Sequence, residues 1–251
     1  MTNAEMWNIV LAQLACDLNC SVEQLLGAKD TFEFVPFQAN PGRRPFPFQK
    51  NENDIQMLSV GHSIVVSAQQ PVLSLIQKKM ELLSRDDAFW MPFVRGHSLY
   101  YLPDLSQNVQ LRAPDGFHYC LVEPPEIYQL YRYEQFKNAL LYDINSDRPD
   151  VLATVAKLGN DIVAMAGASA DSATMWQLGI DVLPEYRGQG LATYLTRWLT
   201  VETLQRGFVP YYGTASSNIA SQRVAHRAGY LPAWMCVHRG GFPVPAKDVL
   251  E

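Results

Sequence analysis

The residues R-G-Q-G-L-A, at positions 187–192, lie in a turn between a predicted strand and a predicted helix. The first N–H groups of a helix have no partners within it, and the peptide dipoles sum there to about half a positive charge. Gly188 and Gly190 carry no side chains that would keep an anion away from these N–H groups. The turn could therefore bind a phosphate group. A second interpretation needs no ligand, because the glycines could serve only to let the helix pack closely against the strand.

Hydrophobic patterning defines the elements on either side of this turn. Before it, apolar and other residues alternate over 175–183, as in a half-buried strand. One face would carry Trp176, Leu178, Ile180 and Val182, and the other Gln177, Gly179 and Asp181. After it, apolar residues recur at the i, i+3, i+4, i+7 and i+8 spacing of a helix that ends at Gly207, and they are Leu191, Tyr194, Leu195, Trp198 and Leu199. This order places the turn at the N-terminus of a helix.

The rest of the chain is expected to form two α+β domains. In the second half we expect strands over 118–122, 152–158, 161–167 and 209–214, a helical region over 125–141 and a helix over 218–228. In the first half we expect helices over 3–16, from Ser21 and over 71–83, with β-rich runs at 31–37 and 54–68. The stretch 102–116 is rich in Pro, Asp, Asn and Gly, so we divide the chain into residues 1–112 and 113–251.

Two motifs in the second half resemble one family. The turn lacks the third glycine of the dinucleotide fingerprint and the G-K-S/T of the P-loop. It fits instead the R/Q-x-x-G-x-G/A signature of the GNAT superfamily of acyl-CoA-dependent N-acetyltransferases. The segment S-N-I-A-S-Q-R-V-A-H-R-A-G-Y at 217–230 resembles the N-x-x-S-x-x-x-A-x-x-x-G-F/Y helix that follows the fifth strand in that family. The resemblance covers roughly 113–240, and the whole chain resembles a bacterial branch that carries an additional N-terminal domain.

This resemblance implies a fold and a set of residues that bind acetyl-CoA. The fold would be a mixed, mostly antiparallel sheet flanked by helices. The pyrophosphate of coenzyme A would lie on backbone N–H groups of the turn, with a hydroxyl added by Thr193, and the turn residues are Arg187, Gly188, Gln189, Gly190, Leu191 and Ala192. The pantetheine arm would pair like an added strand in a splay between the fourth and fifth strands, with Ile180, Asp181 and Val182. Asn218 would reach the pantetheine from the last helix, and no metal is expected.

The catalytic groups of the family have no clear counterparts. The strand-4 position that often carries a base offers Trp176 and Leu178, neither of which can accept a proton. The general base is therefore unknown. Its possible substitutes are Asp171, Asp181 and Glu185, although a solvated carboxylate is the simpler interpretation of each. The tyrosine that often protonates the thiolate is replaced by Ala225. Ser221 lies on the same helical face and is the nearest replacement, although helix packing is an equally good explanation for it.

Other reactive or aromatic side chains have simpler interpretations. His226 lies near Arg223 and Arg227 on the predicted helix, and we interpret the three as a surface cluster, with catalysis by His226 or contacts to the 3′-phosphate of coenzyme A as the alternatives. The four cysteines are taken as structural thiols, with metal ligands or a disulfide as the alternative. The aromatic segment 128–136 occupies the place where the family builds its acceptor site, and core packing explains about half of its rings.

The composition of the chain bears on which classes of binding partner to expect. A net charge of −5 gives no sign of nucleic-acid binding, and without a signal-like or membrane-spanning segment we expect a cytoplasmic protein.

The leading functional prediction is an N-acetyltransferase that transfers the acetyl group from acetyl-CoA directly to a primary amine of a small molecule or peptide. The alternative is a non-catalytic acyl-CoA-binding sensor or structural protein. We also predict that residues 1–112 cover the acceptor site, with stabilisation or a homodimer contact as the other explanation.

Overall fold

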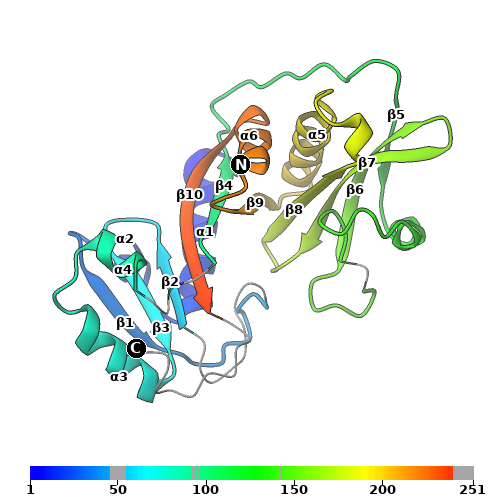
Figure 1. Cartoon of the computed structure of the whole chain (residues 1–251). Helices are drawn as coiled ribbons and strands as arrows, with labels where there is room; N and C mark the ends of the chain where they lie inside the picture. The colour runs from blue at the N-terminus through cyan, green and yellow to red at the C-terminus, as the bar shows by residue number, and fades with distance from the viewer. Residues whose placement is uncertain (46–54, 92–93, 95, 142, 240–251) are drawn as a thin grey trace. The chain divides into compact units, whose positions relative to one another are not determined.

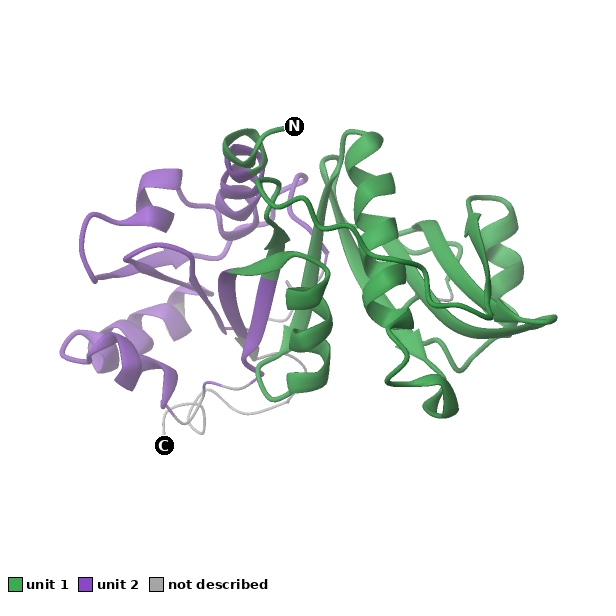
Figure 2. Ribbon diagram, turned by 90° about the horizontal axis from the view of Figure 1, so that it is seen from above, with its two compact units in different colours: residues 1–6, 101–232 green, residues 7–100, 233–251 purple. Residues whose placement is uncertain are grey.

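The chain forms two compact units, shown in different colours in Figure 2. The computed structural model describes residues 1–45, 55–91, 94, 96–141 and 143–239. Unit 1 comprises residues 1–6 and 101–232, and unit 2 comprises residues 7–100 together with the C-terminal residues from 233 onward. No helix in the described part of the chain is both long enough and apolar enough to cross a membrane.

Unit 1 is built on a mixed sheet whose strands lie in the order β4-β9-β8-β7-β6-β5. These strands are β4 (Ser98–Pro103), β5 (His118–Val122), β6 (Asp150–Leu158), β7 (Asp161–Ala170), β8 (Met175–Val182) and β9 (Val209–Ala215). The β5–β6, β6–β7 and β7–β8 pairs are antiparallel, whereas β8 and β9 are parallel. The predicted mixed, mostly antiparallel sheet is confirmed.

The two faces of this sheet carry different elements. Thr154, Ala166 and Ile180 pair across β6, β7 and β8, so their side chains share a face, and the Thr154 hydroxyl donates to the Leu195 carbonyl of α5 (Leu191–Gln205) at 3.0 Å. We call this the α5 face (Figure 1). Helix α6 (Ile219–Arg227) packs against α5 and β9.

The opposite face is covered by the segment 126–141. Its apolar side chains form one core with β6 and β7, and the members buried from this segment are Ile127, Leu130, Phe136, Ala139 and Leu140. The predicted helix over 125–141 is wrong beyond its first turns: only η1 (Glu126–Arg132) is helical, as a 3₁₀-helix, and turns follow. Asp150 accepts hydrogen bonds from the Leu141 amide, and Asp181 accepts from the amides of Asn138 and Ala139. In a continued helix these N–H groups would donate to carbonyl groups of the helix itself.

In unit 2 the strands lie in the order β1-β3-β2-β10. Its strands are β1 (Phe32–Pro36), β2 (Ile55–Ser59), β3 (Ile64–Ala68) and β10 (Tyr230–Arg239), and its helices are α1 (Asn3–Leu18), α2 (Val22–Leu26), α3 (Gln70–Met80) and α4 (Arg85–Phe89). The capping box predicted at Ser21 and Gln24 is present at the start of α2. Side chains of α3, β2 and β3 form the core, among them Ile76, Met57 and Val66.

The boundary between the units differs from the division at residue 112. Residues 235–239 of β10 pair antiparallel with β2, so the end of the described chain completes the sheet of unit 2. The first residues of α1 belong to unit 1, because Asn3 donates to the Asp104 carboxylate at 3.1 Å and accepts from the Leu105 amide at 2.9 Å. The chain therefore changes unit within β4, ahead of the polar stretch 102–116 that suggested the boundary.

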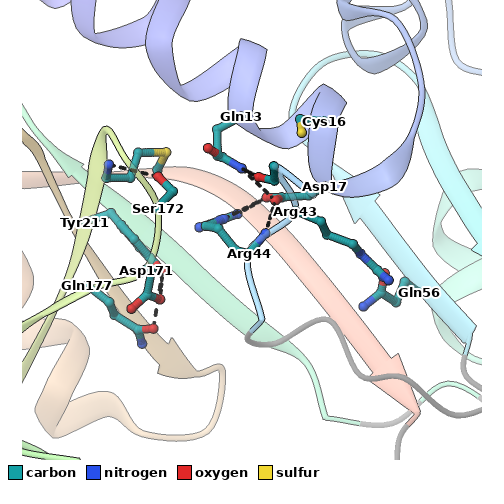
Figure 3. Close-up of polar contacts among 12 residues, drawn as sticks. Gln13, Cys16, Asp17, Arg43, Arg44, Gln56, Asp171, Ser172, Gln177 and Tyr211 are labelled. Carbon is teal, nitrogen blue, oxygen red and sulfur yellow. Dashed lines mark hydrogen bonds and ion pairs between the residues drawn. The ribbon is translucent and has the colours of Figure 1, made fainter. Parts of the chain in front are cut away.

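A buried ion pair anchors the loop after β1 in unit 2 (Figure 3). The Arg44 guanidinium lies 2.6 Å and 2.7 Å from the Asp17 carboxylate, which also accepts from the Arg44 amide at 2.9 Å. The side chains are 1% and 0% exposed, so the two opposite charges compensate each other away from solvent. The four cysteines of the chain are free thiols.

Candidate functional site

The pairing between β8 and β9 stops partway along both strands. Their parallel register runs from Met175 opposite Val209 to Leu178 opposite Tyr212. Strand β8 continues to Val182 and is paired with β7 from Trp176 to Val182, whereas β9 continues to Ala215. Residues 179–182 of β8 therefore have a strand neighbour on one side only among the described residues. The predicted splay between these strands is present, and Ile180, Asp181 and Val182 lie in it.

The glycine turn follows directly at the end of β8. It is fixed there by hydrogen bonds from the Leu183 amide to Val163 (3.0 Å) and from the Arg187 side chain to the Val182 carbonyl (3.1 Å). Gly188 and Gly190 have φ values of 79° and 86°, and Gly190 is the N-cap of α5, which has no side-chain cap. In the described part of the chain we find no acceptor for the N–H groups of residues 188–193. These donors lie at an exposed helix N-terminus, where an anion is stabilised.

The surroundings of the two glycines decide between the two interpretations of the turn. A Cβ added at Gly188 would meet no atom within 4 Å, and one added at Gly190 would meet only the Pro114 side chain, at 3.7 Å. Close packing against the strand is therefore not the reason for glycine here. The left-handed backbone conformation, together with open space above the N–H groups, is the reason that remains.

The last motif lies beside the open half of β9. The Asn218 amide donates to the Ala215 carbonyl at the end of that strand (2.9 Å), and Asn218 Oδ1 caps α6 by accepting from the Ser221 amide at 3.1 Å. Its Nδ2 group remains as a donor at the exposed helix start. Asn218 thus stands next to the splay, but it is also the helix cap, a second role that the motif did not indicate.

Ser221 has a partner that the sequence analysis missed. Its hydroxyl lies 2.7 Å from the hydroxyl of Tyr212, the last β9 residue that pairs with β8. Tyr212 is 2% exposed, and burial raises the pKa of its phenol above the usual value of 10.0. Ala225 is fully buried beneath them. A phenol is therefore present near this helix face, supplied by the strand. The alternation of faces along β9 was the available signal, since Tyr212 falls opposite Leu178 on the α5 face.

The carboxylates considered as bases are otherwise engaged or exposed. Asp171 is 3% exposed and accepts from Arg148 (2.8 Å), from Ser169 (2.7 Å) and from Tyr211, and part of this cluster appears in Figure 3. Asp181 accepts three hydrogen bonds from residues 138 and 139. Glu185 is exposed in the short helix η2 (Pro184–Tyr186). Two of the three candidates thus have structural roles, and the third is solvated.

The remaining polar candidates lie at the surface. Arg223, His226 and Arg227 are exposed on α6, which is compatible both with a surface cluster and with contacts to a phosphate. Among the described residues no three His, Cys, Asp or Glu side chains are grouped as a metal site requires.

Comparison with known proteins identifies the part of the chain that carries this site. The model of the acetyltransferase (GNAT) family matches residues 113–230, from the segment before β5 to the first residue of β10. Residues 113–230 form a GNAT acetyltransferase domain. Members of the GNAT family use acetyl-CoA as the acyl donor. The match begins after β4, so the GNAT domain is preceded by more than a hundred residues that it does not include, as the prediction of an additional N-terminal region requires.

Several solved structures are similar to the chain. A GCN5-related N-acetyltransferase-like protein from Streptococcus suis is 19% identical, with 71% of this chain and 72% of that chain covered and a TM-score of 0.44. A GCN5-related N-acetyltransferase from Sphaerobacter thermophilus is 16% identical, with 78% and 64% covered and a TM-score of 0.46. One from Kribbella flavida is 21% identical, with 59% of each chain covered and a TM-score of 0.43. No curated protein sequence matches the chain significantly.

Proposed function

We propose that the chain is an acetyl-CoA-dependent N-acetyltransferase that transfers the acetyl group directly to a primary amine of a small molecule or peptide. One observation carries the proposal. An exposed helix N-terminus, whose N–H groups have no described acceptor, follows the strand whose pairing with its neighbour stops at Leu178. An anion-binding turn and an unpaired strand edge, joined end to end, suit a ligand with a pyrophosphate at one end and an extended amide-containing arm.

The donor would be held by three parts of the GNAT domain. Backbone N–H groups of residues 187–192, with the Thr193 hydroxyl, would bind the pyrophosphate. The backbone of Ile180, Asp181 and Val182 would pair with the pantetheine amides along the unpaired edge of β8. Asn218 Nδ2 would donate from the start of α6. All of these lie at the end of the sheet where β8 and β9 separate.

The hydroxyl pair would assist the departure of the leaving group. Acetyl-CoA, when bound, supplies an acetyl thioester and leaves as a thiolate. The Ser221 hydroxyl would donate toward the sulfur while accepting a hydrogen bond from the Tyr212 phenol. The Tyr212 phenol is protonated at neutral pH, and burial raises its pKa further above the usual 10.0, so it can donate to Ser221 in this way.

The amine must reach the thioester as its free base, since an ordinary alkyl ammonium has a pKa of about 10.4. None of Asp171, Asp181 and Glu185 is placed as an available buried base, so the base stays unassigned. That observation favours the second candidate function, a non-catalytic acyl-CoA-binding protein. Both functions need the donor site, and only the first needs turnover.

Two measurements separate these functions. Calorimetry should show binding of coenzyme A and none of NAD, because the turn lacks the third dinucleotide glycine. Thiol release from acetyl-CoA should then be followed over a panel of primary amines, with product mass as a check. Coenzyme A binding without turnover of any amine would favour the sensor. Equal or tighter NAD binding would exclude both.

A further inference from the structure

Two glycines face each other across β7 and β8 beneath the segment 138–140. Gly167 and Gly179 are paired in register. A Cβ at Gly167 would lie 1.9 Å from the Ala139 carbonyl oxygen, and one at Gly179 would lie 1.7 Å from the Asn138 carbonyl oxygen. The backbone of the segment therefore rests directly on the backbone of the sheet, and no other residue type would permit this contact.

A carboxylate two residues farther along β8 holds the segment in that place. Asp181 accepts from the Asn138 amide at 2.6 Å, from Asn138 Nδ2 at 2.6 Å and from the Ala139 amide at 3.1 Å. Hydrogen bonds to a charged acceptor are about twice as strong as neutral ones. Farther along, Asp150 binds the Leu141 amide and the Tyr131 hydroxyl. The segment is thus tied to the sheet by Asp181 at residues 138 and 139 and by Asp150 at residue 141.

The position of Asp181 gives this contact a functional meaning. Its backbone belongs to the half of β8 that has no β9 partner, beside the proposed donor site. Its side chain points to the face opposite α5, as Gly179 does, whereas Ile180 lies on the α5 face. The proposed donor contacts at α5 and α6 occupy the α5 face. An acceptor that attacks the thioester must therefore approach from the face that the segment 138–140 covers.

We propose that Asp181 is a positioning residue that fixes residues 138–140 as a wall of the acceptor side, and thereby controls acceptor binding rather than chemistry. This inference rests on the proposed function. Its carboxylate accepts three hydrogen bonds from the segment, so the role proposed for Asp181 is to hold the segment and not to act as the base.

The test uses the full chain with Asp181→Asn. The asparagine side chain has the same shape as aspartate, but an NH2 group replaces one carboxylate oxygen. This donor would face the N–H donors of Asn138 and Ala139. Hydrogen exchange of those two amides should become at least about tenfold faster, and KM for an amine found in the panel should rise about tenfold, as expected for lost bonds to a charged group. The proposed contact of Asp181 with coenzyme A is made by its backbone, which the substitution keeps, so kcat and the affinity for coenzyme A should stay within about twofold.

Two further variants guard the interpretation. Asp161→Asn changes an exposed carboxylate at the start of the neighbouring strand β7 and should leave every readout unchanged. In Gly179→Ala the new methyl group should displace residues 138–140 by direct contact and give the same rise in KM. This variant therefore tests the role of residues 138–140 in acceptor binding even if Asp181→Asn folds poorly.

Each other outcome overturns the proposal. A fall in kcat with unchanged KM would make Asp181 a base, and weaker coenzyme A binding would place its role on the donor side. Unchanged exchange at Asn138 and Ala139 would show that the carboxylate does not hold the segment. If the unmodified protein acetylates no amine, the proposed function fails, and the exchange measurement alone decides whether Asp181 fixes the segment.

Discussion

At the scale of single residues, the glycines of the GNAT domain serve two different purposes. Gly190 has no close neighbour, and its left-handed conformation opens a helix N-terminus to solvent. Gly179 has a carbonyl oxygen where its side chain would be. The first purpose can be predicted from sequence, because strand, glycine turn and helix are consecutive. The second cannot, because the contact joins residues about forty positions apart in a fold that must first be known.

Gly190→Val is expected to abolish coenzyme A binding. A Cβ branch would occupy the open space above the N–H groups of α5. Calorimetry should show an affinity at least about 100-fold weaker, which corresponds to roughly 2.7 kcal/mol. The variant also places a branched residue at positive φ, which costs about 1–2 kcal/mol of stability.

Gly207→Val is the matched control for that strain. Gly207 lies just beyond the other end of α5, has a φ of 87° and has no atom within 4 Å of an added Cβ. It should lose similar stability in urea while binding coenzyme A normally. Should both variants lose binding equally, the turn would matter only for the stability of the helix.

Tyr212→Phe is expected to lower kcat, because the hydroxyl that orients Ser221 is removed. A positioned proton donor is worth about 100-fold or more. The raised pKa of Tyr212 means that its neutral form is retained up to the usual value of 10.0 and lost only above it, so the wild-type rate should show no decline from this group below pH 10.

Tyr230→Phe provides the comparison for Tyr212→Phe. Tyr230 is fully buried, its ring centroid lies 6.2 Å from that of Tyr212, and its hydroxyl lies 2.7 Å from that of Thr200 rather than from Ser221. Both variants should lose about 1 kcal/mol of stability, but only Tyr212→Phe should lose turnover. An equal loss of turnover in the two would assign the Tyr212 hydroxyl to packing.

At the scale of elements, hydrophobic periodicity failed to predict the structure of one segment whose N–H groups donate to distant carboxylates. The strands and helices with clear periods were predicted, including β8, α5 and the capping box of α2. The segment 125–141 was predicted to be helical, yet N–H groups near its end donate to Asp150 and Asp181 and the chain there forms turns. Neither carboxylate lies within that segment, so no local pattern could show the competition.

The loop after β1 depends in the same way on a distant carboxylate. Asp17→Asn would leave Arg44 buried without its charge partner, and we expect a loss of about 3 kcal/mol in the free energy of unfolding, measured in urea. Glu81→Gln, at the exposed end of α3, should change little. The double variant Asp17→Leu/Arg44→Met should lose less than Asp17→Asn, because it leaves no uncompensated charge. A single variant as stable as the wild type would show that the pair contributes nothing.

At the scale of the whole molecule, the boundary was the least predictable feature. The polar stretch 102–116 looks like a linker, but β4 ahead of it is a neighbour of β9 in the sheet. The last described strand, β10, pairs with β2. Composition indicates where a chain is exposed, whereas strand pairing between distant segments decides which parts fold together.

A cut at residue 112 is therefore expected to disrupt folding. The fragment 113–251 lacks β4 and leaves residues 235–239 of β10 without their β2 partner, so it should be poorly soluble or only partly folded by circular dichroism and gel filtration. The fragment 101–232 keeps the unit 1 residues of β4 and omits the unpaired end, so it should fold and bind coenzyme A. This second fragment also tests the prediction that residues 1–112 cover the acceptor site. An unchanged affinity for coenzyme A with a lower kcat/KM for the same amine would support that role, and equal kcat/KM would exclude it.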